Sequence, residues 1–438
     1  MTTSASDSFA DRFFLRVLSL ERHEYFGVAW SFVYFFCILS SYYMMRPMRE
    51  AMGVESGVET IPLLFSSTFL VMLVASPVFG WVASRYARRT FLPWVYAFFA
   101  VNILIFYAAF SFAVRNDLEI VWIGRVFFVW ISVFNLFVVS VFWSFMADIY
   151  TREQGRRLFG VISAGGSAGA LAGPFVTSGL VVPLGFQNLL PISAMLLLFS
   201  IVCIRKLRDW VQTEHEGEAV QTVATAGALG GSPFAGISHV ARSPYLSSIA
   251  AKSIIASLLG TALYMFMNKL VGDAFSGTDQ RTQVFGYIDG ASNTLSLVFQ
   301  LLVVRHAVRR IGLGATLAIM PIMSFIGFAI IAVHPALLFV AVFQGLRRSF
   351  GFGFAKPSSD MLYSVVTPEE KYKAKNFIDT AVYRGGDLVG TWTVKLMWGL
   401  GMTGISIVML PFAAIWTMIA FWLGRDYRRR AAQERDQE

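Results

Sequence analysis

Apolar stretches of about 20 residues follow one another along nearly the whole chain, separated by short polar segments. They do not alternate apolar and polar positions as membrane strands would, and helices satisfy their backbone groups inside hydrocarbon. The pattern therefore predicts an all-α membrane protein with about twelve transmembrane helices in two six-helix halves. The expected spans are 25–48, 61–83, 91–113, 120–147, 158–182 and 188–204, then 245–271, 284–304, 312–333, 336–363, 374–399 and 403–423.

The longest hydrophilic stretch, residues 205–243, separates the two sets of spans. It combines the charged runs RKLRDW and EHEGE with the small-residue segment ATAGALGGSPFAG, which is typical of an inter-domain linker. We expect an N-terminal segment 1–24, a six-helix bundle 25–204, a linker 205–243, a second six-helix bundle 244–424 and a tail 425–438. Residues 1–24 lack the features of a secretory signal, and residues 11–20 are either a short surface helix or a plain polar tail.

Charge changes this picture by giving it an orientation. The chain is 56% hydrophobic and 14% charged with a formal charge of +9, yet its Lys and Arg residues lie in short clusters between spans. This distribution argues against a nucleic-acid-binding domain. The clusters follow even-numbered spans and the opposite loops are acidic, so the positive-inside rule predicts an integral inner-membrane protein with both termini in the cytoplasm.

One cluster carries a motif, Gly80-Trp-Val-Ala-Ser-Arg85-Tyr-Ala-Arg88-Arg89. It resembles the loop signature of the major facilitator superfamily, with Ser84 in place of the usual Asp. Arg309 and Arg310 lie at the equivalent place after the eighth span. The resemblance implies a secondary transporter that works by alternating access, with these residues in gating loops, although topology charges alone would partly mimic the pattern.

The fifth predicted span has glycines at every fourth position, Gly165, Gly169 and Gly173, followed by Pro174. Residues four apart share a helix face, so this spacing predicts close packing against another helix. A phosphate-binding loop is disfavoured because no Gly-Lys-Ser/Thr ending follows.

Ionisable residues inside spans are costly and are therefore candidates for function. The cations among them are Arg46, Arg49, Arg125, Lys252, Arg347, Arg348 and Lys356. In a facilitator the first, fourth, seventh and tenth helices line the cavity, so the resemblance places these side chains on the solute path as substrate-binding residues. For Arg46, Arg49 and Arg125, snorkelling to the membrane surface is an equally good interpretation. Arg347 and Arg348 lie midway along their span, where we expect a wet cavity or a carboxylate partner.

A second set of charged residues is expected to pair with these cations or to carry a coupling proton: Asp289, Asp360, Asp379, Arg384 and Asp387. Arg384 and Asp387, three residues apart, are positioned to pair directly. Purely structural ion pairs would explain some of these charges. The surplus of cations nevertheless favours an anionic solute.

The stretch from Lys356-Pro357-Ser-Ser-Asp360-Met361 through Lys371-Tyr-Lys373-Ala-Lys375 to Ile378-Asp379 and Arg384-Gly-Gly-Asp387 resembles the ATP/ADP translocase family of bacteria and plastids. Asp360, Ser359 and Ala374 depart from that family's Glu, Lys and Gly. The resemblance therefore implies the architecture and a preference for phosphorylated or nucleotide-like anions, but not ATP/ADP exchange itself.

No catalytic signature, metal-ligand spacing or cofactor motif is present in the sequence, so we expect neither an enzyme nor a cofactor. The expected partners are the lipid bilayer, a small anionic solute and either a coupling proton or a counter-substrate. Three interpretations stay open at this point: an exchanger of phosphorylated compounds, a proton-coupled permease or efflux pump, and a membrane protein that does not transport.

Overall fold

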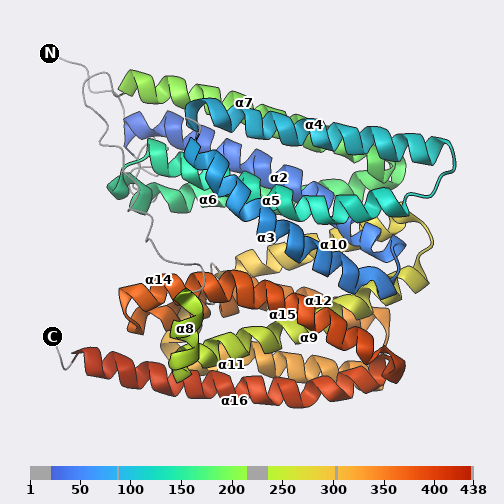
Figure 1. The fold of residues 1–438 in the computed structure, drawn as a ribbon. Helices are drawn as coiled ribbons and strands as arrows, with labels where there is room; N and C mark the ends of the chain where they lie inside the picture. Colours follow the sequence, from blue (N-terminus) through green and yellow to red (C-terminus); the bar gives the residue numbers. More distant parts are fainter. Residues whose placement is uncertain (1–20, 86–87, 215–234, 301–303, 436–438) are drawn as a thin grey trace. The chain divides into compact units, whose positions relative to one another are not determined.

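The structure is a computed structural model that describes residues 21–85, 88–214, 235–300 and 304–435. Within these ranges the chain forms helices and no strand (Figure 1). The α-helices are α2 (Tyr25–Glu55), α3 (Ile61–Arg85), α4 (Arg88–Arg115), α5 (Val121–Ile149), α6 (Arg152–Leu184), α7 (Leu189–Glu214), α8 (Ala235–Arg242), α9 (Pro244–Ala274), α10 (Thr278–Val298), α11 (Val304–Val333), α12 (Leu337–Phe350), α13 (Lys356–Met361), α14 (Pro368–Phe377), α15 (Tyr383–Leu396) and α16 (Gly401–Arg435). Short 3-10 segments are η1 (Arg22–Glu24), η2 (Val58–Thr60), η3 (Phe186–Asn188), η6 (Leu362–Val365) and η8 (Trp398–Leu400), and the π-helical segments are η5 (Gly351–Ala355) and η7 (Ile378–Val382).

Nine helices in the described part of the chain are long and apolar enough to cross a membrane. The described residues of the other three expected spans are also mostly helical, but these spans are more polar or are interrupted. Residues 284–298 belong to α10, which is rich in polar side chains, and the spans expected at 336–363 and 374–399 are interrupted by η5 and η7. Helix α7 continues to Glu214, so the first ten residues of the expected linker are helical.

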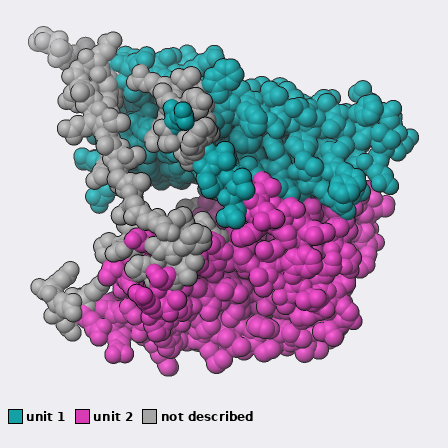
Figure 2. All heavy atoms as spheres, in the orientation of Figure 1, with its two compact units in different colours: residues 1–49, 72–229 teal, residues 50–71, 230–438 magenta. Residues whose placement is uncertain are grey.

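The chain forms two compact units, coloured separately in Figure 2. Unit 1 comprises residues 1–49 and 72–229, and unit 2 comprises residues 50–71 and 230–438. The bundle boundaries expected from the linker stay a prediction. Residues 50–71, the end of α2 and the start of α3, were not expected to group with the second half.

Residues 50–71 join unit 2 because they contribute to its core and to its polar contacts. Val54 and Ile61 lie in the apolar core formed chiefly by α9, α10, α11, α12 and α16. Glu55 pairs with Arg281 of α10 at 2.9 Å, and the Lys395 Nζ atom of α15 donates to the backbone oxygen of Glu59 at 2.8 Å. Burial of apolar groups and these charged contacts together stabilise the segment in unit 2.

In unit 1, α6 packs against α2 through the glycines spaced four apart. A Cβ atom at Gly169 would lie 2.5 Å from the Phe36 backbone oxygen, and one at Gly173 would lie 2.8 Å from Tyr43 Cβ. A Cβ at Gly165 would meet the backbone oxygen of Phe32. The backbone oxygen of Pro174 accepts a hydrogen bond from Ser178 at 2.8 Å, so the proline lies inside a continuous helix. The contact between α6 and α2 at these glycines is the close approach that small residues permit between membrane helices.

Candidate functional site

One face of α9 carries Lys252, Ala256 and Gly260, which are four residues apart and therefore lie one above another. Lys252 is buried, with 8% of its surface exposed, and its Nζ atom donates a hydrogen bond to the Ser359 hydroxyl. The side chain of Arg347, from α12, donates to the backbone oxygen of Ala256. Lys252 of α9 and Arg347 of α12 thus lie on the same face of α9.

Gly260 makes room for Arg347. A Cβ atom at position 260 would lie 2.7 Å from an Arg347 guanidinium nitrogen, closer than side-chain contacts normally allow. The guanidinium therefore occupies the space that any other residue at 260 would fill.

Neither Lys252 nor Arg347 makes an ion pair with a carboxylate in the described part of the structure. The Arg347 Nε atom is buried and has no hydrogen-bond partner there. A buried charged donor that is left unsatisfied costs free energy, so these side chains are suited to receive an anionic group from outside the protein.

Arg348 has a different environment from its neighbour. Its guanidinium pairs with the carboxylate of Asp289 from α10, and Asp289 has only 1% of its surface exposed. Removing one partner of a buried ion pair leaves the other charge uncompensated, so this pair ties α12 to α10.

Four charged residues form an alternating series that we call the charge ladder. Lys375 of α14 contacts Asp360 of α13 at 2.7 Å, Asp360 contacts Lys356 at 3.4 Å, and Lys356 contacts Asp379 of η7 at 2.7 Å. The side chains are about one-third to one-half exposed. The ladder is electrically balanced and links α13 to α14 and η7 in a partly wet environment.

Both π-helical segments adjoin the ladder. Segment η5 ends immediately before Lys356, and η7 contains Asp379. Gly353 of η5 packs against Phe299, and the Gln300 amide donates to the Phe352 backbone oxygen at 3.2 Å, which provides a side-chain partner for a backbone carbonyl of the π turn. Single π turns inside α-helices are frequent at functional sites.

Asp387 accepts a hydrogen bond from Ser257 of α9, whereas the Arg384 side chain is exposed. The direct pairing of Arg384 with Asp387 stays a prediction. Gly386 and Gly390 face Ser257 and Thr261, and these small residues bring α15 close to α9.

The three arginines proposed as site residues in the first half belong to unit 1 and lie over aromatic rings. The guanidinium of Arg49 is 3.8 Å from the ring centre of Phe128, that of Arg125 is 4.5 Å from Trp122, and that of Arg46 is 5.8 Å from Tyr43. Cation–π attraction stabilises such positions, and the Arg49 Nε atom also donates to the backbone oxygen of Phe128 at 3.3 Å.

Among the gating-loop residues expected from the sequence, Arg85 and Arg310 are exposed. The surroundings of Gly80, Arg88, Arg89 and Arg309 lie outside the described part of the structure.

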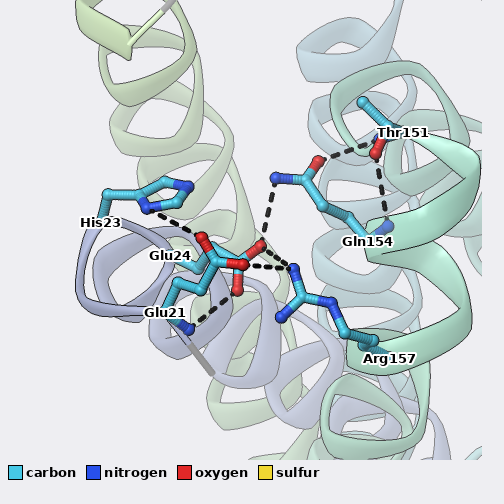
Figure 3. A network of polar contacts seen from close by, with 6 residues as sticks. All are labelled: Glu21, His23, Glu24, Thr151, Gln154 and Arg157. Atoms are coloured by element: carbon cyan, nitrogen blue, oxygen red, sulfur yellow. Dashed lines mark hydrogen bonds and ion pairs between the residues drawn. The ribbon is translucent and has the colours of Figure 1, made fainter. Parts of the chain in front are cut away.

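A polar network in unit 1 was not expected from the sequence (Figure 3). Glu24 is fully buried and accepts hydrogen bonds from Arg157 at 2.8 Å, from Gln154 at 3.2 Å and from the backbone amide of Glu21 at 3.1 Å. Thr151 caps α6 by accepting from the backbone of Gln154. The Thr-x-x-Gln spacing was the signal that could have revealed this cap, but nothing in the sequence placed Glu24 beside it.

Nearby Tyr150 shares a hydrogen bond with Ser31 at 2.9 Å. Burial, with a smaller contribution from the Glu24 charge, raises the pKa of Tyr150, so its hydroxyl stays protonated. The network thus joins the start of α2 to the connection between α5 and α6.

Comparison with known proteins relates this chain to transporters. It is 21% identical to "ADP,ATP carrier protein 2" of Chlamydia pneumoniae over 92% of this chain and 88% of that protein. A bacterial homologue of the iron transporter ferroportin has a similar fold, with a TM-score of 0.65, 12% identity and coverage of 92% and 98%. The nucleoside transporter NupG is also similar, with a TM-score of 0.58, 16% identity and coverage of 92% and 98%.

The sequence model of the Major Facilitator Superfamily matches residues 25–391, most of the chain. The prediction of a multi-pass, all-α membrane protein that is not an enzyme is therefore confirmed. The chain belongs to the major facilitator superfamily.

Proposed function

We propose that this protein is a secondary transporter for a small anionic solute, phosphorylated or nucleotide-like, in the inner membrane with both termini in the cytoplasm. The observation that carries the proposal is the pair of cations Lys252 and Arg347 on one face of α9, neither of which makes an ion pair with a carboxylate in the described structure. The neighbouring carboxylates Asp289, Asp360 and Asp379 are each engaged by another cation.

An anion entering this region would complete hydrogen bonds that the protein leaves incomplete. Arg347 presents a planar fork that suits carboxylate or phosphate oxygens, and Lys252 supplies a compact charge on the same face of α9. The half-exposed charge ladder gives the solute a second binding position, because an anion can replace the Asp379 carboxylate as the partner of Lys356. The name of the Chlamydia relative, an ADP,ATP carrier protein, supports a phosphorylated solute.

The first experiment is ligand-dependent thermal stabilisation of the purified protein, because a ligand that binds the folded state raises its stability by mass action. ATP, ADP, a sugar phosphate and inorganic phosphate are compared with uncharged nucleosides. We expect stabilisation by at least one phosphorylated compound. Stabilisation by nucleosides alone would reject the anionic solute.

A matched pair of variants connects binding to the site. Lys252→Gln removes the buried cation of α9, whereas Lys269→Gln on the same helix removes an exposed lysine that pairs with Asp273 at 2.7 Å. We expect the first change to abolish the ligand-dependent shift and the second to keep it. Equal shifts in the two variants would contradict the proposed site.

A proton-coupled permease is the second candidate, favoured by the buried position of Asp289 beside Arg348. Protonation of Asp289 would release Arg348 and change the contact between α10 and α12. Uptake by reconstituted vesicles separates the candidates. An exchanger needs internal counter-substrate and no proton gradient, whereas a permease responds to a proton gradient with empty vesicles.

A further inference from the structure

The last helix, α16, continues as one helix from Gly401 to Arg435, beyond the apolar stretch 403–423 that the sequence predicts to cross the membrane. Its exposed apolar face ends with Met418, Phe421 and Trp422, which are 42–63% exposed. Tryptophan is typical of the interface between lipid tails and headgroups. The membrane surface is therefore expected at the turn that contains Trp422.

Three arginines follow on the same face. Arg425, Arg428 and Arg429 are exposed, and their spacing of three and four residues aligns them with Met418, Phe421 and Trp422. The opposite face of this helical segment contacts unit 2: Leu423 is buried in its core, and the Arg430 guanidinium lies 4.6 Å from the ring centre of Tyr245. The three exposed arginines thus continue the surface that faces lipid.

A fourth arginine comes from a neighbouring helix. Gly314 of α11 and Gly424 of α16 are in direct contact: a Cβ atom added to Gly424 would collide with the Gly314 backbone, and one added to Gly314 would lie 3.1 Å from the Gly424 Cα atom. Arg310 precedes Gly314 by four residues, across the kink at Gly312, and is also exposed. It therefore lies at the end of α11 where α16 carries its arginines. We call Arg310, Arg425, Arg428 and Arg429 the arginine surface.

In the described part of the chain, no carboxylate makes an ion pair with the arginine surface. The nearest carboxylate in sequence, Asp426, is occupied by Arg430 at 2.8 Å. Four guanidinium groups are thus available at the level of lipid headgroups, where each basic residue attracts anionic lipid and each fork fits two phosphate oxygens.

We propose that the arginine surface binds the headgroup of an anionic phospholipid, whose acyl chains lie along the apolar face of α16. The contact between α11 and α16 at Gly314 and Gly424 sets the distance between Arg310 of α11 and the three arginines of α16. The proposal does not depend on the transported solute.

The test measures binding of phosphatidylglycerol to the purified full-length protein by native mass spectrometry and by thermal stabilisation. Phosphatidylcholine provides the same phosphate without net charge, and inorganic phosphate provides a free anion. We expect phosphatidylglycerol to bind and stabilise, and the other two to do so much less. Equal effects of inorganic phosphate would overturn the assignment to a lipid headgroup.

The variant Arg310→Gln/Arg425→Gln/Arg428→Gln/Arg429→Gln should bind phosphatidylglycerol about a hundredfold more weakly at low salt. Its matched control is Arg205→Gln/Lys206→Gln, which removes two exposed basic residues from α7 in unit 1. A variant with lysine in place of all four arginines keeps the charge and is therefore less prone to misfold. It should bind phosphatidylglycerol with intermediate affinity because the planar guanidinium fork is lost. If the control weakens binding as much as the glutamine variant, or if lysine and glutamine variants bind like the natural protein, the proposal is wrong.

Discussion

Two arginines of unit 1 and two cations of unit 2 lie in different surroundings. Arg49 and Arg125 of unit 1 lie on the faces of Phe128 and Trp122, whereas Arg348 and Lys356 of unit 2 lie against the carboxylates of Asp289 and Asp379. Aromatic faces stabilise a cation without neutralising it, and carboxylates neutralise it and exchange partners. We therefore expect solute-dependent change to be concentrated in unit 2, where the proposed anionic solute would have carboxylates to replace.

The largest expected effect is on Arg347, the cation of unit 2 that is held by a backbone oxygen. Arg347→Gln should weaken binding of the anionic solute by about 10- to 100-fold, because charged hydrogen bonds contribute about 1.5–3 kcal/mol. Isothermal titration with the best ligand from the thermal screen measures this change. An unchanged affinity would make Arg347 a structural residue.

Gly260→Ala sharpens the comparison without removing any charge. The added Cβ would collide with the Arg347 guanidinium and push it from α9, so we expect about tenfold weaker binding. Gly385→Ala on α15 is the matched control, since a Cβ there meets nothing within 4 Å.

If Gly260 acts through Arg347, the Ala substitution should have no further effect in the Arg347→Gln background. Additive losses in the double variant would show that Gly260 matters for helix packing instead.

Exchange of charges tests the ladder of unit 2. Lys356→Asp and Asp379→Lys should each destabilise the protein, and the double variant should recover part of the loss because the opposite charges again face each other. The recovery is expected to be about 1 kcal/mol or less, since both side chains are partly exposed. Chemical denaturation in detergent measures it, and a double variant less stable than either single one would contradict a direct interaction.

The smallest effect is expected in unit 1. Arg49→Gln removes a guanidinium stacked on Phe128 and should lower the free energy of unfolding by about 0.5–1 kcal/mol. Its effect on solute affinity should be smaller than that of Arg347→Gln. An equal or larger loss of affinity would break the contrast between the units and place the solute against Arg49.

The sequence was sufficient for the helices because long apolar stretches determine membrane spans directly. It could not show which of two adjacent arginines meets a carboxylate. Neighbouring residues on a helix point about 100° apart, so the rotation of α12 decides that Arg348 reaches Asp289 and Arg347 reaches Ala256. That rotation depends on packing against α9 and α10, which no local pattern encodes.

Two other features were also beyond local pattern. The π-helical segments η5 and η7 each add a residue to one turn, and the Gly- and Phe-rich run 351–355 is equally compatible with a regular helix. Buried Glu24 was hidden because its partners Gln154 and Arg157 lie about 130 residues away in the chain. Lys356 and Asp360 lie four residues apart and share a helix face, so local spacing could have revealed their contact.

The membership of residues 50–71 in unit 2 has a consequence for the protein as a pair of fragments. A chain cut between residues 214 and 235 would leave Val54 and Ile61 on the first fragment and their core partners, such as Phe266, on the second. The second fragment alone would lack Glu55 opposite Arg281, and its core would be missing part of its apolar surface. The first fragment therefore carries part of the stability of the second. Co-expressed fragments should assemble, whereas the second fragment produced alone should be degraded.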